Sequence, residues 1–111
     1  MPVASVSASE AIRLSESGTW LLDVREQDEW DRGHAPSAHL LPLSELAARV
    51  AEIPTDQRVL VVCLAGARSI RAATALAESG VDAANVSGGM LAWSATEGPL
   101  VSDGVDAARI E

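Results

Sequence analysis

The chain has 111 residues and a formal net charge of −8, from 16 acidic residues and 8 basic residues that are all arginine. This length suits one domain rather than two. An acidic chain without a basic stripe is not expected to bind nucleic acid, and three tryptophans as the only aromatic residues leave few platforms for stacking bases. The single cysteine excludes an internal disulfide.

The sequence gives no indication of targeting or membrane insertion. The first ten residues contain neither a basic segment nor a long apolar core, so no signal peptide is expected. The longest uninterrupted apolar stretch, residues 59–65, is far below the ~20 residues that cross a bilayer. A lone cysteine also fits a reducing compartment. We therefore expect a cytoplasmic protein with no membrane partner.

The first half of the chain alternates strand-like and helix-like segments. In chain order these are a strand at 3–6, a helix at 9–16, a strand at 20–24, a helical turn at 27–32, a strand at 39–41 and a helix at 44–51. Ser7 and Glu10 fit a capping box at the start of the first helix. Gly33 is placed to cap the helical turn at its C-terminal end, and Ser44 to cap the next helix at its N-terminal end.

The second half repeats the alternation. It comprises a strand at 58–62, a helix at 69–78 that Gly80 ends, a short strand at 85–87 and a helix at 90–96. The strand at 58–62 is the most hydrophobic and is expected at the centre of the sheet. The polar segment from Gly98 onward is expected to wrap the surface or to fray. Strands and helices at these spacings predict a parallel sheet covered on both faces.

Cys63 lies at the carboxyl end of the central strand, directly before a helical pattern. Ligands of parallel sheets bind outside this end of the strands. A helix start offers unpaired backbone N–H groups and positive dipole charge, and both favour the thiolate, which is the reactive form of cysteine. Cys63 is therefore predicted to be a nucleophile. The alternative is a buried cysteine that only packs in the core.

The loop that follows Cys63 is suited to binding an anion. If it curls around the sulfur, its backbone N–H groups converge on one position; these belong to Leu64, Ala65, Gly66, Ala67 and Arg68. Gly66 permits a backbone angle that other residues resist. The side chains of Leu64, Ala65 and Ala67 offer no hydrogen bonds, so the backbone must do most of the binding. Such a loop can hold a thiolate, and also an extra sulfur atom on that thiolate.

Four segments resemble the rhodanese family in its single-domain form. They are residues 23–26 (Asp-Val-Arg-Glu) with Glu29 and Trp30, residues 33–36 (Gly-His-Ala-Pro) with Ala38, residues 63–69 (Cys-Leu-Ala-Gly-Ala-Arg-Ser) and residues 88–93 (Gly-Gly-Met-Leu-Ala-Trp). The resemblance covers residues 3–101. It implies an α/β fold of three layers, with a central, mainly parallel sheet of about five strands and helices on both faces. We assign residues 1–104 to this domain and residues 105–111 to a C-terminal tail that is free to fray.

The resemblance implies a sulfurtransferase. Cys63 would take the sulfane sulfur of a small anionic donor such as thiosulfate and become a persulfide. An acceptor outside the chain, which is cyanide, a thiol or a protein, would then remove that sulfur in a second half-reaction. The loop N–H groups would stabilise both thiolate and persulfide. No cofactor is implied, and two histidines and one cysteine at these separations do not form a metal-site spacing.

Loop length and one substitution separate the rival functions. Four residues lie between Cys63 and Arg68, and the resemblance links this length to sulfur transfer. Related phosphatases and arsenate reductases have one residue more, so that rival is disfavoured. Leu64 stands where several thiosulfate-using members have Arg or Lys, which should weaken attraction for a dianion. This keeps a second rival open, namely a non-catalytic or weakly catalytic sulfur carrier or protein-binding module. Ser37, where glycine is usual, concerns a turn more than the chemistry.

The remaining candidates are supporting residues. Asp23 is expected to anchor a loop by hydrogen bonds, and Arg25 to pair with Glu29 four residues on. Arg71 lies one turn beyond Arg68 and, together with it, could make the mouth of the site locally positive. His34 is expected to fix the turn before Pro36 rather than to act as a base.

Overall fold

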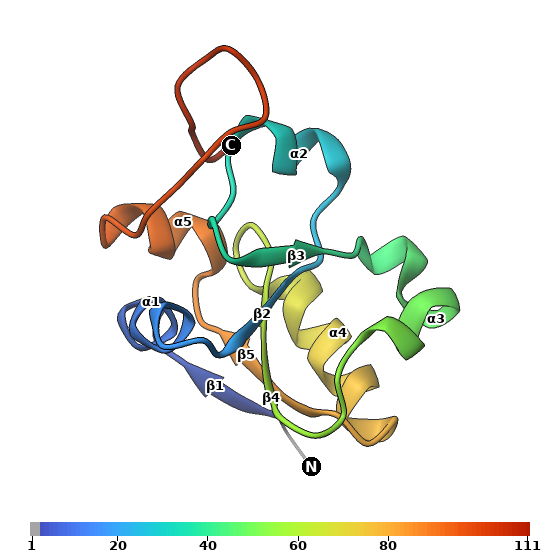
Figure 1. The fold of residues 1–111 in the computed structure, drawn as a ribbon. Coiled ribbons are helices and arrows are strands. Elements are labelled where there is room, and N and C mark those ends of the chain that lie inside the picture. The colour runs from blue at the N-terminus through green and yellow to red at the C-terminus, as the bar shows by residue number, and fades with distance from the viewer. Residues whose placement is uncertain (1–2) are drawn as a thin grey trace.

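The computed structural model describes residues 3–111, and its strands form one five-stranded sheet (Figure 1). The strands are β1 (Ala4–Val6), β2 (Trp20–Asp23), β3 (Ala38–Leu40), β4 (Arg58–Val62) and β5 (Asp82–Val86). Their order is β1-β5-β4-β2-β3, and every pairing is parallel. The most hydrophobic strand, β4, is central, as its composition predicted. The predicted α/β architecture is confirmed.

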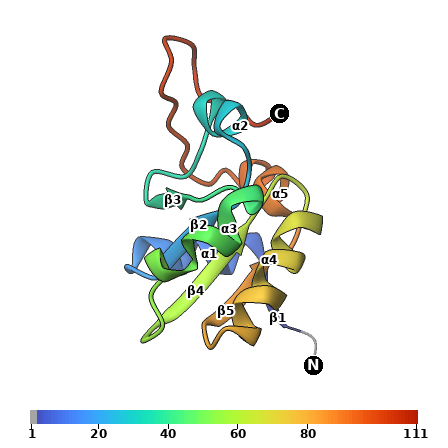
Figure 2. The same cartoon turned by 90° about the vertical axis from the view of Figure 1, so that its right-hand side faces the viewer.

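Helices cover both faces of the sheet. They are α1 (Ala8–Glu16), α2 (Gln27–Arg32), α3 (Leu46–Arg49), α4 (Ala67–Glu78) and α5 (Gly89–Ala95). Two views show α1 and α5 on one face and α3 and α4 on the other, with α2 beyond the sheet beside the C-terminal segment (Figures 1 and 2). One half of the predicted capping box forms at α1, because Ser7 Oγ accepts a hydrogen bond of 3.1 Å from the Glu10 N–H. The Glu10 carboxylate binds Arg13 instead of closing the box.

The core consists of two apolar clusters, one on each side of the sheet. Side chains of a strand alternate between faces, and β4 shows this directly. Val59 and Val61 belong to the cluster beneath α3 and α4, whereas Leu60 and Val62 belong to the cluster beneath α1 and α5. Cys63 continues the alternation and faces the first cluster. Because both faces of β4 are filled, its carboxyl end is a fixed platform for Cys63.

The predicted helix at 44–51 is wrong in form. The chain there makes a 3₁₀ turn η1 (Leu43–Glu45), the single turn α3 and a second 3₁₀ turn η2 (Val50–Glu52). Ser44 lies inside η1, where its hydroxyl donates to Glu26 Oε2 at 3.4 Å instead of capping a helix. Pro42 holds extended backbone, and its carbonyl accepts from the Glu45 N–H at 2.8 Å, so the first turn closes over three residues.

The last strand is longer than predicted. We predicted residues 85–87, whereas β5 begins at Asp82 because it pairs with β4 from the first residue of that strand, Arg58, to Val61. An ion pair of 3.2 Å between Arg58 and Asp82 joins the first residues of the two strands. The small residues Ala83 and Ala84 have low strand propensity, so tertiary pairing rather than local preference sets this boundary.

The C-terminal segment lies along α2. His34 and Val101 form an antiparallel bridge, and the Arg109 N–H donates to the Arg32 carbonyl at 2.9 Å. Gly33 caps α2 as predicted, although its φ of 174° is ordinary extended backbone. Glycine is required there because a Cβ would collide with the backbone of Arg109. The domain boundary at residue 104 stays a prediction. Within residues 3–111, no helix is both long and apolar enough to cross a membrane.

Candidate active site

Cys63 lies where sequence reasoning placed it, immediately after β4 and before α4. Its side chain is only 1% exposed. The Gly66 N–H donates to Cys63 Sγ at 3.1 Å, so the loop does curl back onto the sulfur. Gly66 has a φ of +118°, which a residue with a side chain adopts only under strain. The glycine therefore allows this contact.

The start of α5 orients the first two peptide groups of the loop. The Met90 N–H donates to the Cys63 carbonyl at 2.7 Å, and the Leu91 N–H donates to the Leu64 carbonyl at 3.0 Å. In a trans peptide the N–H points opposite to the C=O, so the N–H groups of Leu64 and Ala65 point away from α5. A Cβ on Gly89 would lie 2.5 Å from both carbonyl oxygens. This explains the glycine at position 89, to which sequence reasoning assigned no such role.

One buried polar side chain, Ser69, contacts the sulfur, and a second, Asn85, binds Ser69 in turn. The Cys63 thiol donates to Ser69 Oγ at 3.3 Å, and the Ser69 hydroxyl donates to Asn85 Oδ1 at 2.6 Å. Asn85 Nδ2 continues to Ser5 Oγ at 3.4 Å. Ser69 and Asn85 are 0% and 3% exposed. Sequence reasoning missed Asn85, and the available signal was an amide between the apolar residues Ala84 and Val86.

Arg68 does not stand free at the mouth of the loop. Its guanidinium makes a bidentate ion pair with Glu29, with Nη1–Oε1 at 2.7 Å and Nη2–Oε2 at 2.9 Å. The hydrogen bonds from Arg68 lower the pKa of Glu29 from 4.5 to about 2, and the same pair raises the pKa of Arg68. The cation next to Cys63 is therefore neutralised over the ordinary pH range.

The predicted pairing of Arg25 with Glu29 is wrong. Arg25 turns inward instead, and its Nη2 lies 2.7 Å from Asp23 Oδ2 with both side chains 0% exposed. Asp23 also accepts from the Arg25 backbone N–H at 3.1 Å, which confirms it as a loop anchor. The Arg25 Nη2 donates to the Gly33 carbonyl at 2.8 Å, so this buried pair ties the end of β2 to the end of α2.

The other two candidates do not contact the sulfur. Arg71 is exposed one turn further along α4. His34 stacks on Trp30 with ring centroids 3.6 Å apart, and its Nδ1 lies 2.8 Å from the Trp30 carbonyl oxygen. This bonding fixes the chain after α2, as expected for a structural histidine.

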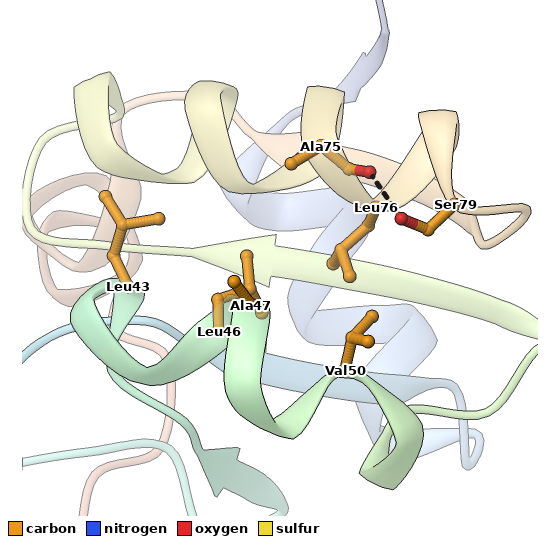
Figure 3. Close-up of a pocket in the computed structure, with 7 residues that line it drawn as sticks. All are labelled: Leu43, Leu46, Ala47, Val50, Ala75, Leu76 and Ser79. Atoms are coloured by element: carbon orange, nitrogen blue, oxygen red, sulfur yellow. Dashed lines mark hydrogen bonds between the residues drawn. The ribbon is translucent and has the colours of Figure 1, made fainter.

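An apolar hollow of about 350 Å³ lies between α3 and α4. Figure 3 shows its lining, which comes from the segment 43–50 and from the C-terminal part of α4 with the residue that follows it; the residues are Leu43, Leu46, Ala47, Val50, Ala75, Leu76 and Ser79. None of these residues belongs to the loop 63–68. The hollow is thus separate from Cys63 and its loop.

Comparisons with known proteins agree with this geometry. The model of the rhodanese-like domain matches residues 7–96. The chain is 38% identical to thiosulfate sulfurtransferase 18 of Arabidopsis thaliana, over 82% of this chain and 78% of that protein. It is 36% identical to a sulfurtransferase of Allochromatium vinosum, over 86% of this chain and 92% of that protein.

A solved structure confirms the fold. A rhodanese-related protein from Thermoplasma volcanium superposes with a TM-score of 0.83 at 28% identity, over 88% of this chain and 97% of that one. The match of the family model spans four of the five strands and every helix. Together with the cysteine loop at the carboxyl end of β4, it shows that this chain belongs to the family of rhodanese-like domains.

Proposed function

We propose that this protein moves a sulfane sulfur from a donor to an acceptor through a persulfide on Cys63. The observation that carries the proposal is the loop itself. Cys63 Sγ accepts from the Gly66 N–H at 3.1 Å, and the carbonyls of Cys63 and Leu64 are bound on the opposite side by α5. This arrangement suits a sulfur that gains negative charge, as oxyanion holes suit oxygen.

Both half-reactions balance without a cofactor. With thiosulfate as donor, the Cys63 thiolate attacks the outer sulfur, a new S–S bond forms, and sulfite leaves with the electron pair of the broken bond. The acceptor, which is cyanide, a thiol or a protein thiol, then attacks the outer sulfur of the persulfide. The Cys63 thiolate leaves and is regenerated. One nucleophile serving two half-reactions predicts ping-pong kinetics.

A second function, that of a sulfur carrier or protein-binding module with weak activity on small donors, is favoured by two observations. Leu64 supplies no charge at the loop, and Arg68 is paired with Glu29. Both weaken attraction for a small dianion. The two functions share the persulfide, and they differ in the turnover of small donors.

Intact mass spectrometry tests the persulfide. Reduced protein incubated with thiosulfate should gain about 32 Da, one sulfur atom, and the Cys63→Ser variant should gain nothing. No gain on the reduced wild-type protein would overturn thiosulfate as donor. A persulfide that forms but does not turn over with cyanide would favour the carrier function. Turnover with parallel double-reciprocal lines would favour the enzyme.

A further inference from the structure

The residues around Cys63 offer little net positive charge to an anionic donor. Arg68 follows the loop directly, and its only ion pair within residues 3–111 is the bidentate one with Glu29. Glu29 is 14% exposed and Arg68 32%, so the pair is partly shielded from solvent. The half-buried Leu64 is the next residue after Cys63. An anionic donor that approaches the loop therefore meets the Arg68 guanidinium with its charge already neutralised by Glu29.

Two exposed apolar residues belong to the helices that flank the loop, Ile70 to α4 and Leu91 to α5. Ile70 is 48% exposed and Leu91 49%, and they are two of the four large apolar side chains exposed in the described part of the chain. The backbone of each residue is bonded to the loop: the Ile70 N–H donates to the Gly66 carbonyl at 3.3 Å, and the Leu91 N–H donates to the Leu64 carbonyl at 3.0 Å. We call Leu64, Ile70 and Leu91 the apolar rim.

We propose that the site selects organic sulfane-sulfur donors with at most one negative charge over the thiosulfate dianion, and that Glu29 sets this preference by neutralising Arg68. The proposal rests on the proposed function, which it deepens. The terminal sulfur of the donor enters the loop, and its organic substituent lies on the apolar rim. Because Cys63 is 1% exposed, only a slender terminal atom can reach the sulfur.

The sulfur transfer balances for this class of donor. With an organic thiosulfonate, R–SO₂–S⁻, the Cys63 thiolate attacks the outer sulfur and forms the Cys63 S–S bond. The bond between the outer sulfur and the sulfonyl sulfur breaks, and the sulfinate R–SO₂⁻ leaves with its electron pair. The total charge is −2 on both sides. With thiosulfate the total charge of thiolate and donor is −3. The site must therefore accommodate one more negative charge near the loop throughout the transfer.

Arg71 is a second arginine at the start of α4, and it does not replace Arg68. It is exposed on α4, one turn beyond the ion pair. Exposed charges are screened over about 8 Å at physiological ionic strength. Its attraction for a donor inside the loop is therefore weaker than that of a guanidinium at the loop itself.

Three donors separate charge from apolar contact. Thiosulfate is a dianion, methanethiosulfonate is a monoanion with a small substituent, and benzenethiosulfonate is a monoanion with an apolar ring. The readout is the rate at which Cys63 gains one sulfur by intact mass, measured for the full chain at fixed ionic strength. Comparing each variant with the wild type for the same donor removes the intrinsic reactivity of the donor. If no donor loads Cys63, the proposed function itself fails.

Glu29→Gln is the first variant. Its amide oxygen can still accept from the Glu26 N–H, which Glu29 Oε1 binds at 3.0 Å, so α2 keeps its cap. Freeing the charge of Arg68 should raise loading by thiosulfate roughly fivefold and loading by methanethiosulfonate roughly twofold. Asp28→Asn is the matched control. It removes the same charge from an exposed neighbour that does not touch Arg68, and it should leave the ratio of the two donors unchanged.

Equal changes for both donors, or the same result from Asp28→Asn, would overturn the role of Glu29. Leu64→Arg keeps the proposal testable if Glu29→Gln does not fold, because it adds a cation without disturbing the pair. It should raise loading by thiosulfate about tenfold more than loading by benzenethiosulfonate. A donor-independent effect would contradict the proposal.

Leu91→Ser tests the apolar rim. It should lower loading by benzenethiosulfonate roughly threefold to tenfold and leave methanethiosulfonate nearly unchanged, because only the ring contacts the rim. Val105→Ser is the control, since Val105 is fully exposed in the C-terminal segment. If Leu91→Ser slows both thiosulfonates equally, the rim does not bind the substituent and the proposal is wrong.

Discussion

Two arginine–carboxylate pairs lie near the loop, and they differ in depth. Arg25 and Asp23 are 0% exposed and bind each other 2.7 Å apart beneath α2. Arg68 and Glu29 are 32% and 14% exposed and lie at the mouth. A buried pair must stay intact because neither charge has water as an alternative partner. A half-exposed pair can be opened at small cost, so it can tune the charge that a donor meets.

Breaking the deep pair should have the largest effect on folding. Arg25→Ala leaves the Asp23 carboxylate buried without its partner and should lower the free energy of unfolding by about 3–5 kcal/mol. Urea denaturation followed by tryptophan fluorescence measures this. Arg13→Ala, which removes an exposed arginine paired with Glu10, is the control and should change the midpoint little. If Arg25→Ala lowered the free energy of unfolding no more than Arg13→Ala does, the buried pair would not differ from an exposed one and the comparison would be wrong.

The hydrogen bonds from Cys63 to Ser69 and from Ser69 to Asn85 are buried like the pair of Arg25 and Asp23. Ser69→Ala removes the hydroxyl that joins Cys63 Sγ to Asn85 and should slow sulfur loading roughly tenfold to a hundredfold. It should also cost about 1–2 kcal/mol of stability, because the Asn85 oxygen loses a buried donor.

Ser69→Thr is the matched variant, since it keeps the hydroxyl. Intact mass spectrometry gives the loading rate, and thermal unfolding gives the stability. If Thr fails to restore loading while folding normally, the hydroxyl does not assist the sulfur.

Opening the pair at the mouth should cost less and should depend on pH. The folded pKa of Glu29 is about 2, below the unfolded value of 4.5. The pair therefore stabilises the protein fully above the unfolded pKa, and this contribution is lost as the pH falls through the folded pKa. Glu29→Gln should lower stability by about 1 kcal/mol near neutral pH, because Arg68 is partly solvated.

Urea titrations at several pH values check the sign of this effect. The difference between wild type and Glu29→Gln should shrink between about pH 5 and about pH 2, since protonated Glu29 also lacks the charge. A constant difference over that range would mean that the charge of Glu29 contributes no stability.

The sequence predicts features that depend on neighbouring residues. The apolar strand 58–62 and the glycine loop after it place Cys63 correctly, because strand, turn and helix preferences all act within a few residues. The helix at 44–51 is wrong because three short turns there follow the packing of apolar side chains on the core rather than a helical preference.

The partners of charged residues are less predictable. Arg25 has carboxylates two and four residues away, and spacing alone favours the wrong one, since burial turns its guanidinium onto Asp23. Glu29 and Arg68 are 39 positions apart, and only the fold brings them together. The charge beside the loop is therefore a property of tertiary structure, whereas the proposed nucleophile, Cys63, can be identified from the sequence itself.

The smallest effect on sulfur loading is expected for a substitution of Arg71. This substitution tests whether any unpaired positive charge near the loop attracts thiosulfate. Sequence spacing suggested that Arg68 and Arg71 together make the mouth positive. With Arg68 paired, Arg71→Ala should change thiosulfate loading by less than about twofold at physiological ionic strength. Alanine preserves α4, so folding does not confuse the result. A fall of about tenfold would show that Arg71 supplies the attraction, and the contrast between a rigid deep region and a neutralised mouth would no longer hold.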